Sequence, residues 1–176
     1  VDISYRTEAE YNAKHAYYLK SAGEILTIKL VENLREGESG VYGVGARGNV
    51  SKYPSGVYNF SISFPCGPDN AQMLKDAALE EVNNLVNEGP TAEDVEKVKE
   101  AQRLELKEDM KTNRFWLSTL NKMLYHDVEF SEMLNMPEEI EGLTAAKIDC
   151  PEMRTCIAVK LPLSSKPATI LHLVIG

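Results

Sequence analysis

Arg35 and Tyr42 are the two residues of this sequence whose types and spacing most suggest chemistry. They bracket a short polar turn within the segment LREGESGVYGVGA, residues 34–46. A leucine-rich helical pattern ends at Arg35, and a glycine-spaced pattern typical of a strand opens at Tyr42. A guanidinium stays charged at any working pH, and a phenol can donate its hydroxyl, so the pair could aim two donors at one ligand.

The same two residues also have an ordinary structural explanation. A cation in the last turn of a helix interacts favourably with the negative end of the helix dipole. A tyrosine at the start of a strand can pack its ring and leave its hydroxyl in water. On these residue properties alone, the structural explanation is the stronger of the two.

The histidines do not form a recognisable catalytic set. The segment HDVEF, residues 126–130, approaches the inverted zinc motif His-x-x-Glu-His, but Phe130 stands where the second histidine is required. Two protein ligands are too few for a catalytic zinc, which takes about three. We therefore expect no metal site here, and His15 and His172 lie far away along the chain.

The glycines of GVGARG, residues 43–48, do not fit a nucleotide loop. They follow a helical pattern and lie inside a strand pattern, whereas a dinucleotide-binding loop follows a strand and opens a helix. Glycines at alternate strand positions are expected to let another backbone or a ligand come close.

Composition limits the classes of partner. The chain has 176 residues, enough for one domain or one with a small appendage, and 27 acidic against 19 basic residues give a net charge of −8. No basic stripe is available for a nucleic-acid backbone, so we expect no nucleic-acid partner. No apolar run approaches a membrane span. Cys66, Cys150 and Cys156 are scattered and predict free thiols.

Periodicity predicts an alternation of helices with antiparallel strands. The expected elements are a strand at 1–5, a helix at 12–35, strands at 42–50 and 57–64, helices at 71–88, from 92, at 115–124 and at 138–147, and a strand at 155–163. Apolar residues at helix or strand spacing should form the core: Ala22, Ile25, Leu26, Leu30, Val31, Leu34, Tyr58, Phe60, Ile62, Phe64, Ala71, Leu74, Ala78, Val82 and Leu85. The helix from 92 carries Val95, Val98, Leu106 and Met110, with polar Gln102 interrupting the row, and the pattern at 115–124 runs through Trp116, Leu120, Met123 and Leu124. This order predicts an α+β fold, an antiparallel β-sheet covered on one face by helices.

Helix ends can also be placed. Thr7 and Glu10 have the spacing of a capping box, and Asn12 is a second possible start for the first helix. Asp69 or Asn70 can cap the helix that follows the hairpin, and Gly89 should end it.

Four strings of the sequence are distinctive: LVENLREGESGVYGVGARGNVSKYP, SISFPCGPDN, VNNLVNEGPTAEDVEKVKEA and KTNRFWLSTL. Together they resemble the insulinase/pitrilysin family of zinc metallopeptidases, and most closely its bacterial, processing-peptidase-like members. The match is most specific at LRE…GVY and at GPTAEDVEKVK. It implies a LuxS/processing-peptidase-like C-terminal module over residues 1–148, incomplete at its start, with a divergent strand and tail over 149–176.

The resemblance also implies that the zinc site and this chain belong to different halves of the enzyme. A peptidase of this family has two homologous halves, and the zinc motif lies in the first. This chain is similar to a C-terminal module that lacks it, so the zinc of the full-length enzyme would be bound by another domain and the fragment alone should be inactive. Its partner would be the N-terminal zinc-binding half of the same protease or a partner chain, with a peptide as substrate.

The family gives Arg35 and Tyr42 roles. Its second half contributes an arginine and a tyrosine with this spacing, which reach the zinc site across the chamber. The resemblance implies that Tyr42 donates in trans to the substrate carbonyl as it becomes an oxyanion, so that it is both catalytic and substrate-binding. Arg35 would hold the substrate backbone or orient the tyrosine. With the family added, function is favoured over the structural explanation.

Two other functions stay open. Some members of the superfamily are non-catalytic structural or partner subunits, and a stand-alone peptide-binding domain is a third possibility. The family suggests a bacterial periplasm or cell envelope as the compartment, with the cytoplasm as the alternative.

Overall fold

The computed structural model describes residues 1–37, 43–129, 131, 134–149 and 172–174. The chain divides into two compact units, one formed by Val1–Thr91 with Ala145–Gly176 and the other by Ala92–Thr144. The expected boundary between residues 148 and 149 stays a prediction.

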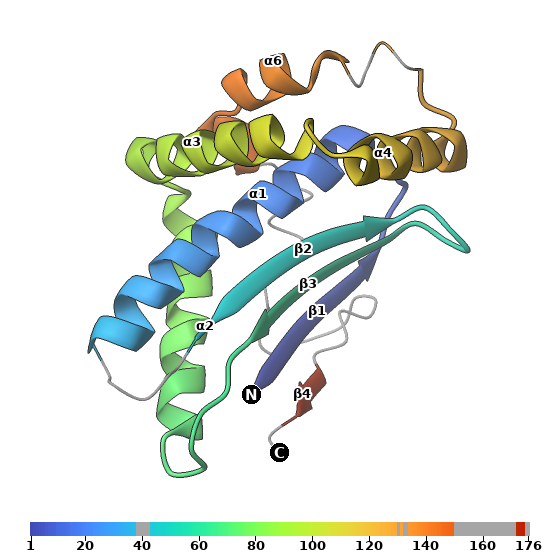
Figure 1. Cartoon of the computed structure of the whole chain (residues 1–176). Coiled ribbons are helices and arrows are strands. Elements are labelled where there is room, and N and C mark those ends of the chain that lie inside the picture. Colours follow the sequence, from blue (N-terminus) through green and yellow to red (C-terminus); the bar gives the residue numbers. More distant parts are fainter. Residues whose placement is uncertain (38–42, 130, 132–133, 150–171, 175–176) are drawn as a thin grey trace. The chain divides into compact units, whose positions relative to one another are not determined.

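The first unit is built on a four-stranded antiparallel sheet (Figure 1). Its strands are β1 (Asp2–Glu8), β2 (Gly45–Ser51), β3 (Val57–Ser63) and β4 (His172–Val174), in the order β2-β3-β1-β4. The predicted hairpin and first strand are confirmed. The strand expected at 155–163 lies outside the described residues.

The two faces of this sheet differ in polarity because side chains alternate along each strand. Tyr58, Phe60 and Ile62 point to one face, and each is at most 1% exposed. Their partners Ile3 and Tyr5 on β1 are buried with them. The other face carries Arg6, Arg47, Asn49, Asn59, Ser61 and Ser63. The alternation read from the sequence is confirmed.

Helix α1 (Ala13–Leu30) continues as a π-helical segment, η1 (Val31–Gly37). The side-chain Oδ1 of Asn12 accepts the backbone N–H groups of Lys14 and His15 at 2.9 and 3.2 Å. The capping box at Thr7 is wrong, because Thr7 is paired with Tyr58 inside β1 and is not free to start a helix. The expected apolar stripe of this helix is buried through Leu34, except that Val31 is only half-buried.

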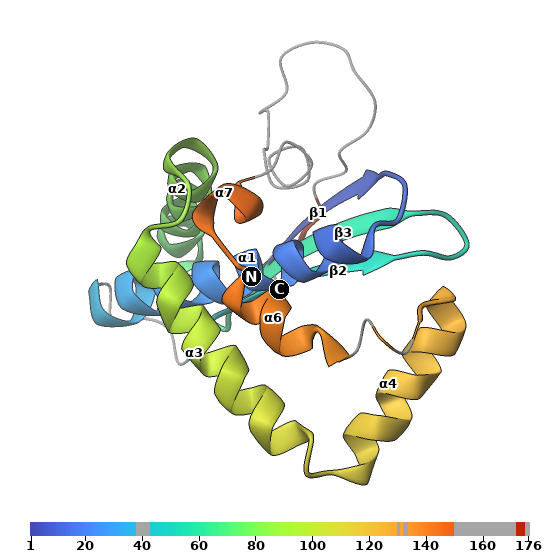
Figure 2. The ribbon, with the colours of Figure 1, turned by 90° about the horizontal axis from the view of Figure 1, so that it is seen from above.

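Helix α1 crosses β2 in close contact (Figure 1, and from above in Figure 2). A Cβ placed on Gly48 would lie 2.2 Å from the backbone oxygen of Leu19. A Cβ on Gly23 would lie 2.9 Å from the Gly48 nitrogen. Two glycines, one on each element, therefore let the helix backbone approach the strand backbone.

Helices α2 (Ala71–Glu88) and α7 (Ala145–Ile148) complete the first unit, and both contact α1. All five residues of the predicted α2 stripe are buried. Asn70 occupies the N-cap position, but its side chain makes no capping hydrogen bond. Gly89 ends the helix as expected, with a φ of 74° that favours glycine. The fold class predicted for the chain is confirmed by this sheet and its helices.

The second unit contains α3 (Ala92–Asp109), α4 (Asn113–His126) and α6 (Met136–Glu141). Of the apolar positions expected here, Val95 and Val98 are buried, whereas Met110, Leu120 and Leu124 are exposed. Thr112 caps α4 by accepting the N–H of Phe115 at 3.2 Å. The single helix expected at 138–147 is instead two short helices, α6 and α7, because α6 ends at Glu141 with Gly142 as its C-cap.

Candidate functional site

The two residues singled out by the sequence lie at the edge of what the structure describes. The backbone of Arg35 belongs to η1, one residue after the fully buried Leu34. The side chain of Arg35 and all of Tyr42 lie outside the described residues. Their proposed roles therefore rest on the elements that flank them, η1 before and β2 after.

Those flanking elements are firmly placed. Leu34 is 0% exposed, and η1 contacts both α1 and α2. The segment that carries Arg35 is therefore anchored by a buried leucine. On the other side, β2 is held in the sheet from Gly45, which pairs with Ser63.

The glycines that follow Tyr42 are of two kinds. A Cβ on Gly43 or on Gly45 would meet no atom within 4 Å, whereas a Cβ on Gly48 would collide with Leu19. At Gly48 the backbone that comes close is that of α1, so this glycine serves the fold. Gly43 and Gly45 leave open space next to the sheet and fit the approach of another molecule.

The outer edge of β2 is closed at Ala46. The Oγ1 of Thr27 accepts the Ala46 N–H at 2.8 Å. The Thr27 proton is shared between the carbonyl oxygens of Gly23, at 2.8 Å, and Ala46, at 3.2 Å. A peptide cannot add to the strand at this position without displacing α1, since the backbone groups of Ala46 already have a partner.

The polar face of the sheet carries two arginines that sequence reasoning missed. Arg47 on β2 lies opposite Ser61, and Arg6 on β1 lies opposite Asn59. Both arginines are exposed. Their strands are distant in the sequence, so only the strand register brings the two arginines onto one surface. The sequence feature that could have revealed them is the alternation of each arginine with buried residues along its strand.

The described residues do not offer a zinc site. Among them, no group of three or more His, Cys, Asp or Glu side chains is placed to hold a metal ion. The HDVEF segment is not helical throughout, because α4 ends at His126 and Asp127 takes a left-handed φ of 57°. His15 instead lies 3.3 Å from the hydroxyl of Tyr58, through its Nδ1. The side chains within the described ranges therefore do not fit a zinc centre.

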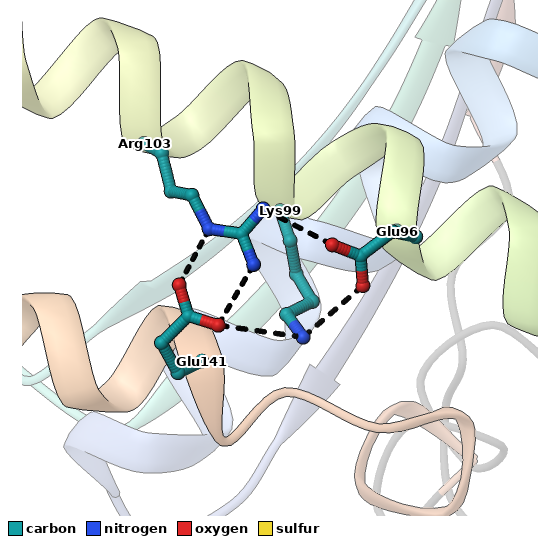
Figure 3. Close-up of polar contacts among 4 residues, drawn as sticks. All are labelled: Glu96, Lys99, Arg103 and Glu141. Carbon is teal, nitrogen blue, oxygen red and sulfur yellow. Dashed lines mark hydrogen bonds and ion pairs between the residues drawn. The ribbon is translucent and has the colours of Figure 1, made fainter.

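A cluster of ion pairs lies in the second unit and is structural (Figure 3). The guanidinium of Arg103 donates to Glu141 at 2.7 Å and to Glu96 at 3.0 Å, and Lys99 contacts both carboxylates. Hydrogen bonding by Arg103 lowers the pKa of Glu141, and Lys99 with Arg103 lowers the pKa of Glu96. All four side chains are satisfied by one another, so the cluster fastens α6 to α3.

Two further predictions concern membrane-spanning segments and the thiols. None of the helices in the described ranges is both long and apolar enough to cross a membrane. Cys66 is a half-buried free thiol, and Cys150 and Cys156 lie outside the described residues.

Comparison with known proteins identifies the family. A family model described as the peptidase M16 inactive domain matches residues 1–102. A zinc protease PQQL-like protein of Arabidopsis thaliana is 29% identical over 103 residues, which covers 56% of this chain and 11% of that protein. The range matched by the family model, residues 1–102, includes η1, β2 and both predicted site residues.

Solved structures share the fold. The periplasmic protease PqqL from Escherichia coli has a TM-score of 0.66 at 16% identity, covering 89% of this chain and 17% of that one. A peptidase M16 inactive domain from Pseudomonas fluorescens has a TM-score of 0.66 at 14% identity, and the match covers 88% of this chain and 37% of that one. A predicted insulinase family protease from Yersinia pestis has a TM-score of 0.62 at 12% identity, and the match covers 89% of this chain and 37% of that one.

The chain thus spans only 11% of the curated relative and 17% of PqqL. The resemblance to a non-zinc-binding module of the insulinase/pitrilysin peptidases is confirmed by the family match and by the shared fold. Because the family model covers more than half of the sequence, this chain belongs to the family of peptidase M16 inactive domains.

Proposed function

We propose that this chain is a C-terminal substrate-binding module of a zinc metalloendopeptidase, with the zinc bound by another domain. The observation that carries the proposal is the match of residues 1–102 to the M16 inactive domain, which spans the segment from Arg35 to Tyr42. The zinc would supply an activated water in its own domain. The residues of this chain would hold the peptide and stabilise charge on it.

Tyr42 and Arg35 are proposed to act on the peptide carbonyl. A phenol aimed where negative charge develops stabilises the transition state more than the ground state, and loss of one such donor costs roughly 3 kcal/mol. A guanidinium can hold a carbonyl or a carboxylate through its fork of donors. The anchored η1 and the open space at Gly43 and Gly45 support this assignment.

The test is Tyr42→Phe in the parent protein, with cleavage of a fluorogenic peptide as the readout. We expect the kcat to fall about 100-fold with little change in the melting temperature, because the ring is kept and only the donor is lost. Tyr53→Phe is the matched control, since Tyr53 lies in the exposed hairpin turn and is 50% exposed. Unchanged cleavage by Tyr42→Phe would refute the catalytic role.

A second candidate function is a non-catalytic structural or partner subunit of the same superfamily. It is favoured by the name of the matching family, which describes an inactive domain. The parent sequence separates the two: an intact His-x-x-Glu-His motif with a distal glutamate supports a peptidase, and its absence supports a subunit.

We also propose an extracytoplasmic setting, the periplasm or cell envelope of a bacterium. The support is the similarity to PqqL, described as a periplasmic protease. Cell fractionation with an antibody against this chain tests it, and recovery in the cytoplasmic fraction would favour the alternative compartment.

A further inference from the structure

The polar face of the sheet has the composition of a binding surface. We define the open face as Arg6, Arg47, Asn49, Asn59, Ser61 and Ser63, which all point away from the buried face. Four hydroxyl and amide side chains lie between or beside two arginines. Gly45 precedes Arg47 on the same face, and a Cβ there would meet nothing within 4 Å.

The arginines of the open face have no partner in the described part of the chain. Neither guanidinium makes an ion pair or a hydrogen bond with a described residue. The groups directly opposite them are Asn59 and Ser61, which carry no charge. The nearest acids on this face, Asp2 and Glu8, lie toward the two ends of β1.

This arrangement is unusual for the chain as a whole. The net charge is −8, yet this face holds two cations. Arg47 has no acid next to it on β2 or β3, and Arg6 has Glu8 two residues further along β1. A face of this kind is complementary to carboxylates, and its serine and asparagine side chains can bind the amides of an extended peptide. It is a poor match for nucleic acid, because two cations make no basic stripe and no aromatic side chain of the face is available for stacking.

We propose that the open face binds an acidic, extended stretch of peptide, with Arg6 and Arg47 each pairing with one carboxylate. The proposal rests on the proposed function, which makes a peptide the ligand of this module, and names the substrate class. Carboxylate recognition by the forked guanidinium supplies the selectivity, and the neutral side chains between the arginines bind the peptide backbone.

The strand register sets the expected spacing of the acidic residues in the bound peptide. Arg47 and Arg6 are two strands apart and two residues apart along the strands. With strands about 4.8 Å apart and a rise of about 3.4 Å per residue, their Cα atoms lie roughly 12 Å apart. An extended peptide covers about 13 Å in four residues, so carboxylates at positions i and i+4 fit the two arginines.

The experiment uses the 176-residue chain and fluorescein-labelled peptides, with anisotropy as the readout. One peptide carries glutamate at every fourth residue of a Gly-Ser background, and two others carry glutamine or lysine there. We expect the glutamate peptide to bind at about 20 mM salt and to lose most of its affinity at about 300 mM salt, because exposed ion pairs are screened. The other two peptides should bind at least about five-fold more weakly.

The variants locate the binding. Arg6→Gln with Arg47→Gln should lower the affinity for the glutamate peptide about ten-fold and leave the glutamine peptide unaffected. Arg114→Gln with Lys122→Gln removes the same charge from exposed positions of α4 and should change nothing. Equal binding of all three peptides would overturn the proposal, and so would an equal loss in the control variant. Binding of an oligothymidylate through the same arginines, as tight as that of the glutamate peptide, would also overturn it, since the face would then bind any anion.

This assay needs neither zinc nor turnover, so its outcome is separate from that of Tyr42→Phe. Acidic-peptide binding with unchanged cleavage by Tyr42→Phe would refute only the catalytic role. Slower cleavage by Tyr42→Phe with no preference for the acidic peptide would refute only the open-face proposal. In an active parent enzyme, loss of both arginines should raise the KM for acidic substrates and leave their kcat unchanged.

Discussion

The side chain of Thr27 on α1 closes the edge of β2 by hydrogen bonding to the backbone of Ala46. Its Oγ1 accepts the Ala46 N–H at 2.8 Å and lies 3.2 Å from the Ala46 carbonyl. An edge strand normally leaves such groups free to pair with another chain. Here a helix hydroxyl takes that place, and the glycine pair Gly23 and Gly48 brings the helix close enough to do so.

We expect Thr27→Val to destabilise the protein by about 1–3 kcal/mol, because the isosteric change leaves the half-buried N–H of Ala46 without its acceptor. Urea denaturation followed by circular dichroism measures the difference in the free energy of unfolding. Thr27→Ser keeps the hydroxyl and is the control, with a loss well below that of Thr27→Val. Equal losses in the two variants would show that packing of the methyl group, and not the hydrogen bond, matters.

Substitution of Gly48 by alanine should be more damaging. The added methyl would lie 2.2 Å from the Leu19 oxygen, so α1 would have to move away from β2. Overpacking of this kind typically costs about 1–3 kcal/mol and can exceed that range. Gly45→Ala is the matched control on the same strand: its methyl meets nothing within 4 Å, and we expect a change within about 0.5 kcal/mol. Thermal and urea unfolding of the two variants give the comparison.

Elements with a strong internal period were predictable from the sequence. The alternation of Tyr58, Phe60 and Ile62 and the helical stripe from Ala71 to Leu85 each specify a buried face without reference to distant residues. The capping box at Thr7 failed for a long-range reason. Pairing with β3 extends β1 as far as Glu8, which is matched with Val57, and so moves the helix start to Asn12.

The residues of the candidate functional site were harder to predict from the sequence than the fold was. The importance of Arg35 and Tyr42 came from family resemblance, since their residue properties alone favoured a structural explanation. Arg6 and Arg47 are 41 positions apart, as their numbers show, and meet on one face only because β3 pairs with both of their strands. Gly23 inside a helical pattern was the local sign of a close approach, but its partner Gly48 required the structure.

Tyr5 offers a stabilising substitution. Its side chain is fully buried, and within the described residues its hydroxyl makes no hydrogen bond. A buried polar group without a partner costs about 1–3 kcal/mol, so Tyr5→Phe should raise the free energy of unfolding by about 1 kcal/mol. Tyr58→Phe is the contrasting variant, because the Tyr58 hydroxyl donates to the Glu10 carbonyl at 3.1 Å, and its loss should destabilise. A destabilised Tyr5→Phe protein would show that the hydroxyl has a partner in solution.

The same hydroxyl predicts a pH dependence at high pH. Burial raises the pKa of Tyr5 from 10.0 to about 12. Between these values the unfolded chain loses the proton while the folded chain keeps it, so the folded protein loses stability as the pH rises. The stability advantage of Tyr5→Phe over the wild type should therefore widen from about pH 9 to about pH 11. A constant difference across this range would mean that the hydroxyl is solvated in the folded state.

The ion pairs of Arg103 and Glu141 should control the local opening of α6 more than global stability. Both side chains are well exposed, and exposed pairs contribute little to the free energy of unfolding. The pair nonetheless joins α6, only six residues long, to α3 through two parallel hydrogen bonds. Glu141→Gln should therefore speed amide hydrogen exchange over Met136–Glu141 and leave the exchange of α3 unchanged.

Charge-conserving and pH controls make this last prediction specific. Arg103→Lys keeps the charge but loses the fork, so it should also speed the exchange of α6. Lys111→Gln breaks an exposed pair with Glu108 and should not affect α6. Because Arg103 lowers the pKa of Glu141 in the fold, the protection is fully present above the ordinary value of 4.5 and is lost as the pH falls through the lowered pKa of the folded state. The wild type and Glu141→Gln should then converge as the pH falls. A difference that stays the same from neutral to acid pH would indicate that the glutamine acts by altering packing instead of by removing a charge.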